Sequence, residues 1–399
     1  MRFSDRALSI QPFLAMEFGQ RAAVLEGHGA NVIKLNIGEP DFGAPAPVVQ
    51  AMEAALQGTP MGYTSALGLW ELREAIAQYY KSTYGVSISP SRIVVTAGAS
   101  AALLLVTAAL VNPGDKVLVG DPSYPCNRQF LAGYGADVEL VPTTAASRFQ
   151  LDAALVQAHW SEAVRGLMIA TPGNPTGTSV PLEELSAICS HARANGAWRI
   201  VDEIYLGLAD RGPDGRAPAT VLTVDPDAIV INSFSKYFGM TGWRLGWCVV
   251  PAEMVPVMER LAQNYYICPS TLAQHAALSC FRPETIAICE QRRTELEVRR
   301  TVVLDGLARI GLPVPVLPDG AFYVYFNVAH TGLSAMEFCL RALEEAHVAL
   351  TPGNDFGQCG GAEHVRLSYA ASVDELKEGL ERLGYFMSQF IKIQSLASI

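Results

Sequence analysis

The hydrophobic and polar positions alternate between two periods from about residue 70 onward. In WELREAIAQYYKSTYG, residues 70–85, the apolar positions recur at helical spacing, and Gly85 marks the end of the predicted helix. The next run, RIVVTAG at 92–98, is short and β-branched, which is typical of a buried strand. The alternation continues through SAALLLVTAALV, DKVLVGD, GLMIATP, PLEELSAICSHARANG, WRIVDEIY, AIVINSFSK and WRLGWCVV. Continuous apolar strands alternating with helices predict an α/β fold with a mainly parallel, helix-covered sheet.

The pattern changes near residue 283. A long helical segment over 283–310 is followed by the strand-like runs AFYVYFNV and HVRLSY, with the helical run AMEFCLRALEEAH between them. This order predicts a second, smaller α+β domain, and we expect the first forty-odd residues to join it. The predicted organisation is an N-terminal arm and part of the small domain at 1–45, a large domain at 46–285 and a C-terminal small domain at 286–399.

Length and composition agree with a two-domain enzyme. The chain has 399 residues, more than the roughly 250–300 at which a single core usually stops growing. Half of the residues are hydrophobic and 17% are charged, which argues against disorder. The net charge of −10 and the lack of any Lys/Arg block argue against nucleic acid as a partner.

Neither a membrane span nor an export signal is expected. The longest apolar stretch, about 99–111, is shorter than the ~20 residues that a bilayer span requires, and the charged start MRFSDRALSI lacks a continuous apolar segment. The eight cysteines form no CxxC pair and no metal-like spacing with the seven histidines. We therefore expect no metal site, and reduced thiols in a cytoplasmic protein.

The stretch SFSKYFGMTGWRLGW, residues 233–247, contains a lysine with distinctive neighbours, Lys236. A lysine amine can condense with a carbonyl to form an imine when part of it is unprotonated near neutral pH. Pyridoxal phosphate is one carbonyl compound that proteins hold in this way. It also needs an anion site for its phosphate, a carboxylate for its ring nitrogen and hydrogen-bond donors for its phenolic oxygen.

Candidate phosphate ligands occur at two places. Ser233, Ser235 and Arg244 surround the lysine in the sequence, and the guanidinium fork of Arg244 suits a phosphate. The run TAGASAALLL adds a tight turn at Gly98 and a helix start at 99–100, whose free N–H groups favour an anion.

Candidate groups for the ring follow other predicted strands. Asp202 ends the strand WRIVD, where carboxyl ends of parallel strands present ligand-binding groups, although the neighbouring Glu203 leaves the choice of carboxylate open. Tyr205 follows shortly afterwards, and Asn174 lies in the Pro/Gly-fixed loop ATPGNPTG. Tyr124, in DPSYP, offers an aromatic face to a flat ring.

Taken together, the motifs resemble those of the class I aminotransferases, which are fold type I pyridoxal-phosphate enzymes. They occur in the family's order over nearly the whole chain: LNIGEPDF, YTSALGLWELREAIA, TAGAS, DPSYP, TPGNPTG, VDEIY, SFSKYFGMTGWRLGW and HVRLSY. The resemblance implies a large domain with a mainly parallel seven-stranded sheet between helices, a smaller α+β domain, and a homodimer with shared active sites.

The resemblance also implies roles for the matching residues. Lys236 would form the internal aldimine and move the substrate's α-proton, Asp202 would keep the pyridine nitrogen protonated, and Tyr205 completes the implied catalytic set. Tyr205 and Asn174 would hydrogen-bond the phenolic oxygen, and Tyr124 would stack on the ring. The implied phosphate ligands are Gly98, Ala99, Ser100, Ser233, Ser235 and Arg244, with Tyr63 reaching in from a second subunit. The implied substrate-binding residues are Gly38, Asn174 and the carboxylate-binding Arg366.

The activity implied is transfer of an amino group between an L-amino acid and a 2-oxo acid such as 2-oxoglutarate. One aspartate-using subgroup carries a lysine shortly after the glycine of the phosphate loop, whereas residues 98–101 here read Gly-Ala-Ser-Ala. We therefore expect a neutral donor such as alanine. Aspartate aminotransferase and a pyridoxal-phosphate-dependent carbon–sulfur β-lyase of the same fold remain alternatives. A cofactor-binding transcriptional regulator would need an added basic domain, and only about forty residues precede the first motif.

Overall fold

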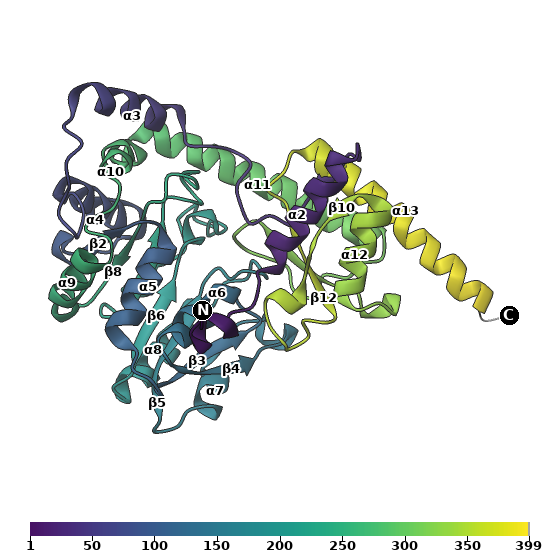
Figure 1. Cartoon of the computed structure of the whole chain (residues 1–399), viewed down its shortest axis with the longest axis horizontal. Helices are drawn as coiled ribbons and strands as arrows, with labels where there is room; N and C mark the ends of the chain where they lie inside the picture. Colours follow the sequence, from purple (N-terminus) through teal and green to yellow (C-terminus); the bar gives the residue numbers. More distant parts are fainter. Residues whose placement is uncertain (398–399) are drawn as a thin grey trace.

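A seven-stranded sheet forms the centre of the larger part of the molecule (Figure 1). The structure is a computed structural model that describes the backbone of residues 1–397 and the side chains of residues 1–389. The strands are β2 (Ile93–Thr96), β3 (Lys116–Asp121), β4 (Asp137–Pro142), β5 (Val164–Ala170), β6 (Trp198–Asp202), β7 (Ile229–Ser233) and β8 (Gly246–Val249). Their spatial order is β2-β8-β7-β6-β5-β3-β4. Strand β8 pairs antiparallel with both β2 and β7, and the other four pairs are parallel, so the predicted, mainly parallel sheet is confirmed.

Successive side chains of a strand point to opposite faces of the sheet, and helices cover both faces. On β3, Val117 and Val119 belong to one apolar cluster together with Leu105 of α5, whereas Leu118 belongs to another together with Ile188 of α8. The helices of the chain are α1 (Asp5–Ser9), α2 (Leu14–Gly27), α3 (Ala46–Gly58), α4 (Trp70–Tyr84), α5 (Ala99–Leu110), α6 (Pro125–Gly133), α7 (Ala153–Ala158), α8 (Leu182–Ala194), α9 (Val255–Tyr265), α10 (Thr271–Ala277), α11 (Pro283–Arg309), α12 (Ala335–Ala346) and α13 (Val373–Ala397). Because α5 and α8 pack against opposite faces, the sheet lies between two helical layers.

The predicted helix ends agree with the local chemistry. Helix α4 ends before Gly85, which adopts φ 70°, a left-handed conformation that glycine takes at little cost.

Helix α11 covers 27 residues and spans the distance between the large sheet and the smaller domain (Figure 1).

The smaller domain has its own strands. In sheet order β11 (Thr351–Pro352), β12 (His364–Ser368) and β9 (Tyr323–Asn327) form an antiparallel sheet. The short strand β1 (Ile33–Lys34) pairs in parallel with β10 (Val348–Ala349), which places the N-terminal segment beside the C-terminal elements. The residue boundaries of the domains remain a prediction.

Within the described residues, no helix is long and apolar enough to cross a membrane. The same part of the chain contains no group of three or more His, Cys, Asp or Glu side chains arranged to hold a metal ion.

Candidate active site

A cavity of about 390 Å³ lies between the carboxyl ends of the parallel strands and the small domain. Ala170, Asp202 and Ser233, the last residues of β5, β6 and β7, line it from the large domain. Tyr323 of β9 and Arg366 of β12 line it from the small domain. Open α/β sheets bind ligands at this edge because the strand-to-helix loops gather there.

Lys236 lies in this cavity just after β7. Its Nζ donates a hydrogen bond of 2.6 Å to the carbonyl oxygen of Gly38. Burial lowers the pKa of the lysine to about 8. The carboxylate of Glu39 raises this pKa, whereas the cations of Arg366 and Arg244 lower it. An amine with this pKa is partly unprotonated near neutral pH, as imine formation requires.

The geometry resolves the choice between the two adjacent carboxylates. Asp202 lines the cavity and accepts a 3.0 Å hydrogen bond from the backbone N–H of Ile204, and burial raises its pKa to about 6. Glu203 is not among the lining residues, and its carboxylate instead accepts 2.7 Å hydrogen bonds from the Thr220 hydroxyl and the Val221 N–H. Asp202 is therefore the carboxylate that a ring in the cavity could meet.

One end of the cavity has the properties of an anion site. Gly98, with φ 84°, precedes α5, and a Cβ built on it would lie 2.5 Å from Nη2 of Arg244. The Arg244 guanidinium therefore packs against the turn at the N-terminus of α5, where N–H groups lack helical partners. Ser233 and Ser235 share a 2.8 Å hydrogen bond beside it, and Ser100 lines the same cavity. A cation, hydroxyls and a helix N-terminus fit the phosphate of pyridoxal phosphate.

Arg366 occupies the other end and is almost completely buried. Its Nη1 donates to Oδ1 of Asn174 at 2.9 Å, and its Nη2 donates to the carbonyl oxygen of Asn36 at 2.6 Å. Its Nε has no hydrogen-bond partner among the described residues, so the guanidinium retains a spare donor. The structure therefore places Arg366, which the resemblance implied as a substrate-binding residue, on the lining of the cavity.

The structure brings together nearly all the residues predicted for the site. Tyr124 also lines the cavity, and its ring meets that of Phe13 edge to face at a centroid distance of 6.1 Å. The predicted residues on the lining are Gly38, Ala99, Ser100, Tyr124, Asn174, Asp202, Tyr205, Ser233, Ser235, Lys236, Arg244 and Arg366. Gly98 lies behind Arg244, and Tyr63 is 82% exposed and outside the lining.

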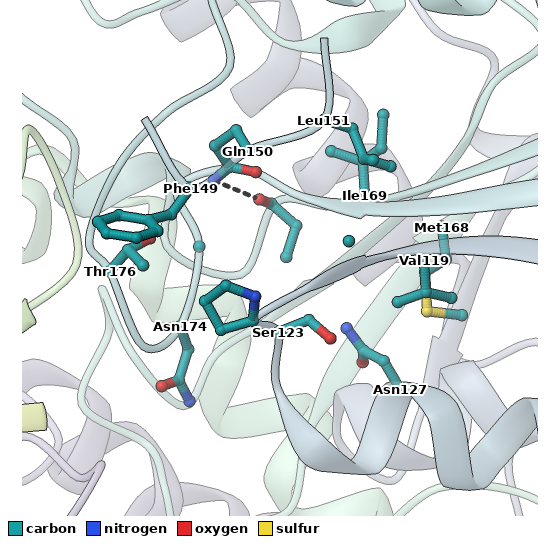
Figure 2. A pocket seen from close by; sticks show the side chains of 14 residues that line it. Val119, Ser123, Asn127, Phe149, Gln150, Leu151, Met168, Ile169, Asn174 and Thr176 are labelled. Atoms are coloured by element: carbon teal, nitrogen blue, oxygen red, sulfur yellow. Dashed lines mark hydrogen bonds between the residues drawn. The ribbon is translucent and has the colours of Figure 1, made fainter. Parts of the chain in front are cut away.

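A second cavity of about 20 Å³ lies behind Asn174 (Figure 2). Gln150 lines it and donates to the carbonyl oxygen of Ala170 at 3.2 Å, the dashed line in Figure 2. Gln150 also donates to the carbonyl oxygen of Thr178 at 2.6 Å, so it links the two sides of the loop that carries Asn174. This space would hold about one water molecule, which is too little for a substrate. The hydrogen bonds of Gln150 beside it instead support the loop of Asn174.

Sequence reasoning missed several residues of the larger cavity. Phe13, Met16 and Ile37 come from the N-terminal segment and form an apolar part of the wall, and Glu39 lies beside them in the motif LNIGEPDF. Tyr323 places its hydroxyl 2.7 Å from that of Tyr205. The alternating run AFYVYFNV indicated only that Tyr323 belongs to a strand.

Comparisons with known proteins agree with this geometry. The family described as aminotransferase class I and II matches residues 30–383. The valine–pyruvate aminotransferase of Mycobacterium tuberculosis is 39% identical over 380 residues, which cover 95% of this chain and 97% of the relative. The aspartate/prephenate aminotransferase of Thermus thermophilus is 34% identical over 388 residues, covering 95% and 97%. The crystal structure of an aminotransferase from Mycobacterium tuberculosis superposes with a TM-score of 0.94 at 38% identity and covers 98% of this chain and 100% of that one.

Proposed function

Because the chain belongs to the aminotransferase class I and II family, we propose that it moves an amino group between a neutral L-amino acid and a 2-oxo acid, with Lys236 as the proton-transferring residue. The observation that carries this proposal is the buried amine of Lys236 in one cavity with Asp202, between Arg244 at one end and Arg366 at the other. Such a constellation provides for both a phosphorylated cofactor and an amino-acid carboxylate.

Pyridoxal phosphate, when bound, supplies a ring that withdraws electrons from the substrate's α-carbon. We propose that Arg244, Ser100, Ser233 and Ser235 hold its phosphate, together with the N-terminus of α5 formed by Gly98 and Ala99. The proposed residues for the ring are Asp202 at the nitrogen, Tyr205 and Asn174 at the phenolic oxygen, and Tyr124 against the face.

The protein's own groups move the proton. With a pKa lowered to about 8, Lys236 can accept a proton from the substrate's α-carbon and return it in the reverse half-reaction. Gly38, whose carbonyl oxygen accepts a hydrogen bond from Nζ, holds the amine on the side of the cavity that Arg366 also lines.

The lining of the cavity favours a neutral side chain. Among the described lining residues the cations are Lys236, Arg244 and Arg366, and each already has a proposed role. Phe13, Met16 and Ile37 are apolar, so the described lining offers no further cation to pair with a second carboxylate. Alanine or valine therefore fits better than aspartate, and the relative named as a valine–pyruvate aminotransferase supports a neutral donor.

A panel of amino donors tests this proposal. Alanine, valine, phenylalanine, aspartate and arginine would each be assayed with 2-oxoglutarate and with pyruvate where the donor differs from alanine. We expect kcat/KM for alanine or valine to exceed that for aspartate by at least about tenfold, the value of one unfavourable polar contact. Preference for aspartate would overturn the neutral pocket, and pyruvate release from a β-thio amino acid without an acceptor would support the lyase alternative.

We also propose a homodimer in which Tyr63 of one subunit contributes to the phosphate site of the other. Tyr63 is 82% exposed and Met61 is 43% exposed, so this loop presents apolar surface to solvent in the single chain. Arg244 is exposed as well, although it belongs to the proposed phosphate site. A second subunit that covers this loop would account for both observations.

A further inference from the structure

Tyr323 is a fully buried side chain of β9 on the cavity lining, where it lies next to Tyr205, Arg366 and Gly38. Its hydroxyl lies 2.7 Å from the hydroxyl of Tyr205, and its ring lies under the guanidinium of Arg366, with Cζ 4.6 Å from the ring centroid. A Cβ on Gly38 would come within 2.6 Å of the same hydroxyl, so Gly38 leaves room for it. Tyr323 therefore contacts both Tyr205, which we propose binds the cofactor, and Arg366, which we propose binds the substrate carboxylate.

We propose that Tyr323 is a positioning residue with two separable functions: its hydroxyl strengthens Tyr205 as a hydrogen-bond donor, and its ring fixes Arg366 for the substrate carboxylate. This inference rests on the proposed function, in which Tyr205 donates to the phenolic oxygen of pyridoxal phosphate.

The first function follows from the number of hydrogens available. A tyrosine hydroxyl donates one hydrogen bond. If Tyr205 donates to the cofactor, its oxygen is left as an acceptor, and the 2.7 Å bond must then be donated by Tyr323. A donor that itself accepts a hydrogen bond is polarised and donates more strongly in a buried site.

The second function follows from the face of the ring. An arginine over an aromatic face is held by cation–π attraction and by packing, and burial strengthens both. Tyr323 and Phe356 both present rings to Arg366, with centroid distances of 4.6 and 4.8 Å from Cζ. Removal of one ring leaves the guanidinium free to move on that side.

Two substitutions separate these functions. Tyr323→Phe removes the hydroxyl and keeps the ring, whereas Tyr323→Leu removes both. Tyr325→Phe is a matched control, because Tyr325 lies on the same strand, is also buried, is absent from the cavity lining, and has a hydroxyl with no hydrogen-bond partner among the described residues.

The first readout is the absorbance of the holoenzyme as a function of pH, which reports the proton on the Lys236 nitrogen. A donor at the phenolic oxygen weakens that oxygen's hold on this proton, so loss of donation raises the titration midpoint. We expect a rise of a few tenths of a pH unit for Tyr323→Phe, and about one unit for Tyr205→Phe, which removes the donor itself. The double variant should match Tyr205→Phe alone, and Tyr325→Phe should match the wild type.

The second readout is the KM of the amino donor. We expect Tyr323→Phe to leave KM within about twofold and Tyr323→Leu to raise it about tenfold, because only the second variant exposes one side of Arg366. An unchanged midpoint in Tyr323→Phe alongside a shifted midpoint in Tyr205→Phe would overturn the hydroxyl function, and equal KM values for the Phe and Leu variants would overturn the ring function. If Tyr205→Phe itself shifts nothing, the failure lies with the proposed role of Tyr205 and takes the hydroxyl function with it.

Discussion

Lys236 provides the most direct test at the scale of a single residue. Its amine has a pKa lowered to about 8 by burial, whereas an ordinary lysine titrates near 10.4. We expect borohydride reduction of the cofactor-loaded protein to abolish its visible absorbance band and to fix the cofactor on Lys236. Peptide mapping measures the position of the adduct. An adduct on Lys34 or Lys116 would refute the assignment.

The same pKa gives a pH dependence whose sign is defined. Lys236 loses its proton as the pH rises through about 8. In the cofactor-free protein, the rate at which an amine-reactive reagent modifies Lys236 should therefore rise through that pH. Lys116, which bonds to Glu139 and has a pKa raised by that contact, should react only at higher pH. Equal pH profiles for the two lysines, followed by peptide mass spectrometry, would contradict the lowered pKa.

Asp202→Ala tests the proposed partner of the ring nitrogen. The change leaves Lys236 able to bind the cofactor but removes the carboxylate that would keep the nitrogen protonated. We expect the rate of each half-reaction to fall by several orders of magnitude, while the cofactor dissociation constant changes by far less. Stopped-flow absorbance with a single substrate measures the first quantity. Wild-type rates in both directions would end this assignment.

At the scale of elements, the sequence predicted those parts of the site that lie directly after strands. Asp202 ends one apolar run and Lys236 follows another, so the pattern indicated this edge of the sheet, although it left the choice between Asp202 and Glu203 open. It could not place Phe13 or Tyr323, because their positions depend on docking between elements far apart in the chain. The Tyr205–Tyr323 bond joins residues 118 positions apart, and no local pattern encodes such a contact.

Helix α11 is joined to the neighbourhood of the site by a charge network that the sequence analysis did not predict. Glu290 accepts hydrogen bonds from Arg211, from Arg293 at 2.9 Å and from the hydroxyl of Tyr237 at 2.7 Å. Tyr237 is the residue next to Lys236, so α11 is connected to the loop that carries the lysine.

Glu290→Gln should therefore destabilise the protein. The change leaves two partly buried arginines with a weaker acceptor, and we expect the free energy of unfolding to fall by about 1–3 kcal/mol. Glu17→Gln is the matched control, because its pair with Arg21 is exposed on both sides, and it should cost less than about 0.5 kcal/mol. Denaturant unfolding followed by circular dichroism measures both variants. Equal midpoints would contradict the structural role of the network.

At the scale of the whole molecule, the alternation of strands and helices predicted the class of the fold, and the order of motifs predicted its family. Both are confirmed by the mixed, mostly parallel sheet and by relatives that cover nearly the whole chain. Tyr63 is different, because the single chain leaves it 82% exposed and gives it no place in the cavity. Its proposed role depends on a second subunit, which no pattern within one chain can position.

Mixed subunits test this last proposal. A tyrosine hydroxyl would add one neutral donor to the phosphate that we propose Arg244 holds, worth about 1–2 kcal/mol, so Tyr63→Phe should weaken cofactor binding about tenfold and leave the dimer intact. When Lys236→Ala subunits are combined with Tyr63→Phe subunits, each heterodimer should have one site with both native residues, made from Lys236 of the second subunit and Tyr63 of the first. The affinity of that site for pyridoxal phosphate, measured by fluorescence titration, should return to the wild-type value because the site contains all its native ligands. A monomer by light scattering, or a mixture without any site of wild-type affinity, would show that the site is built from one chain alone.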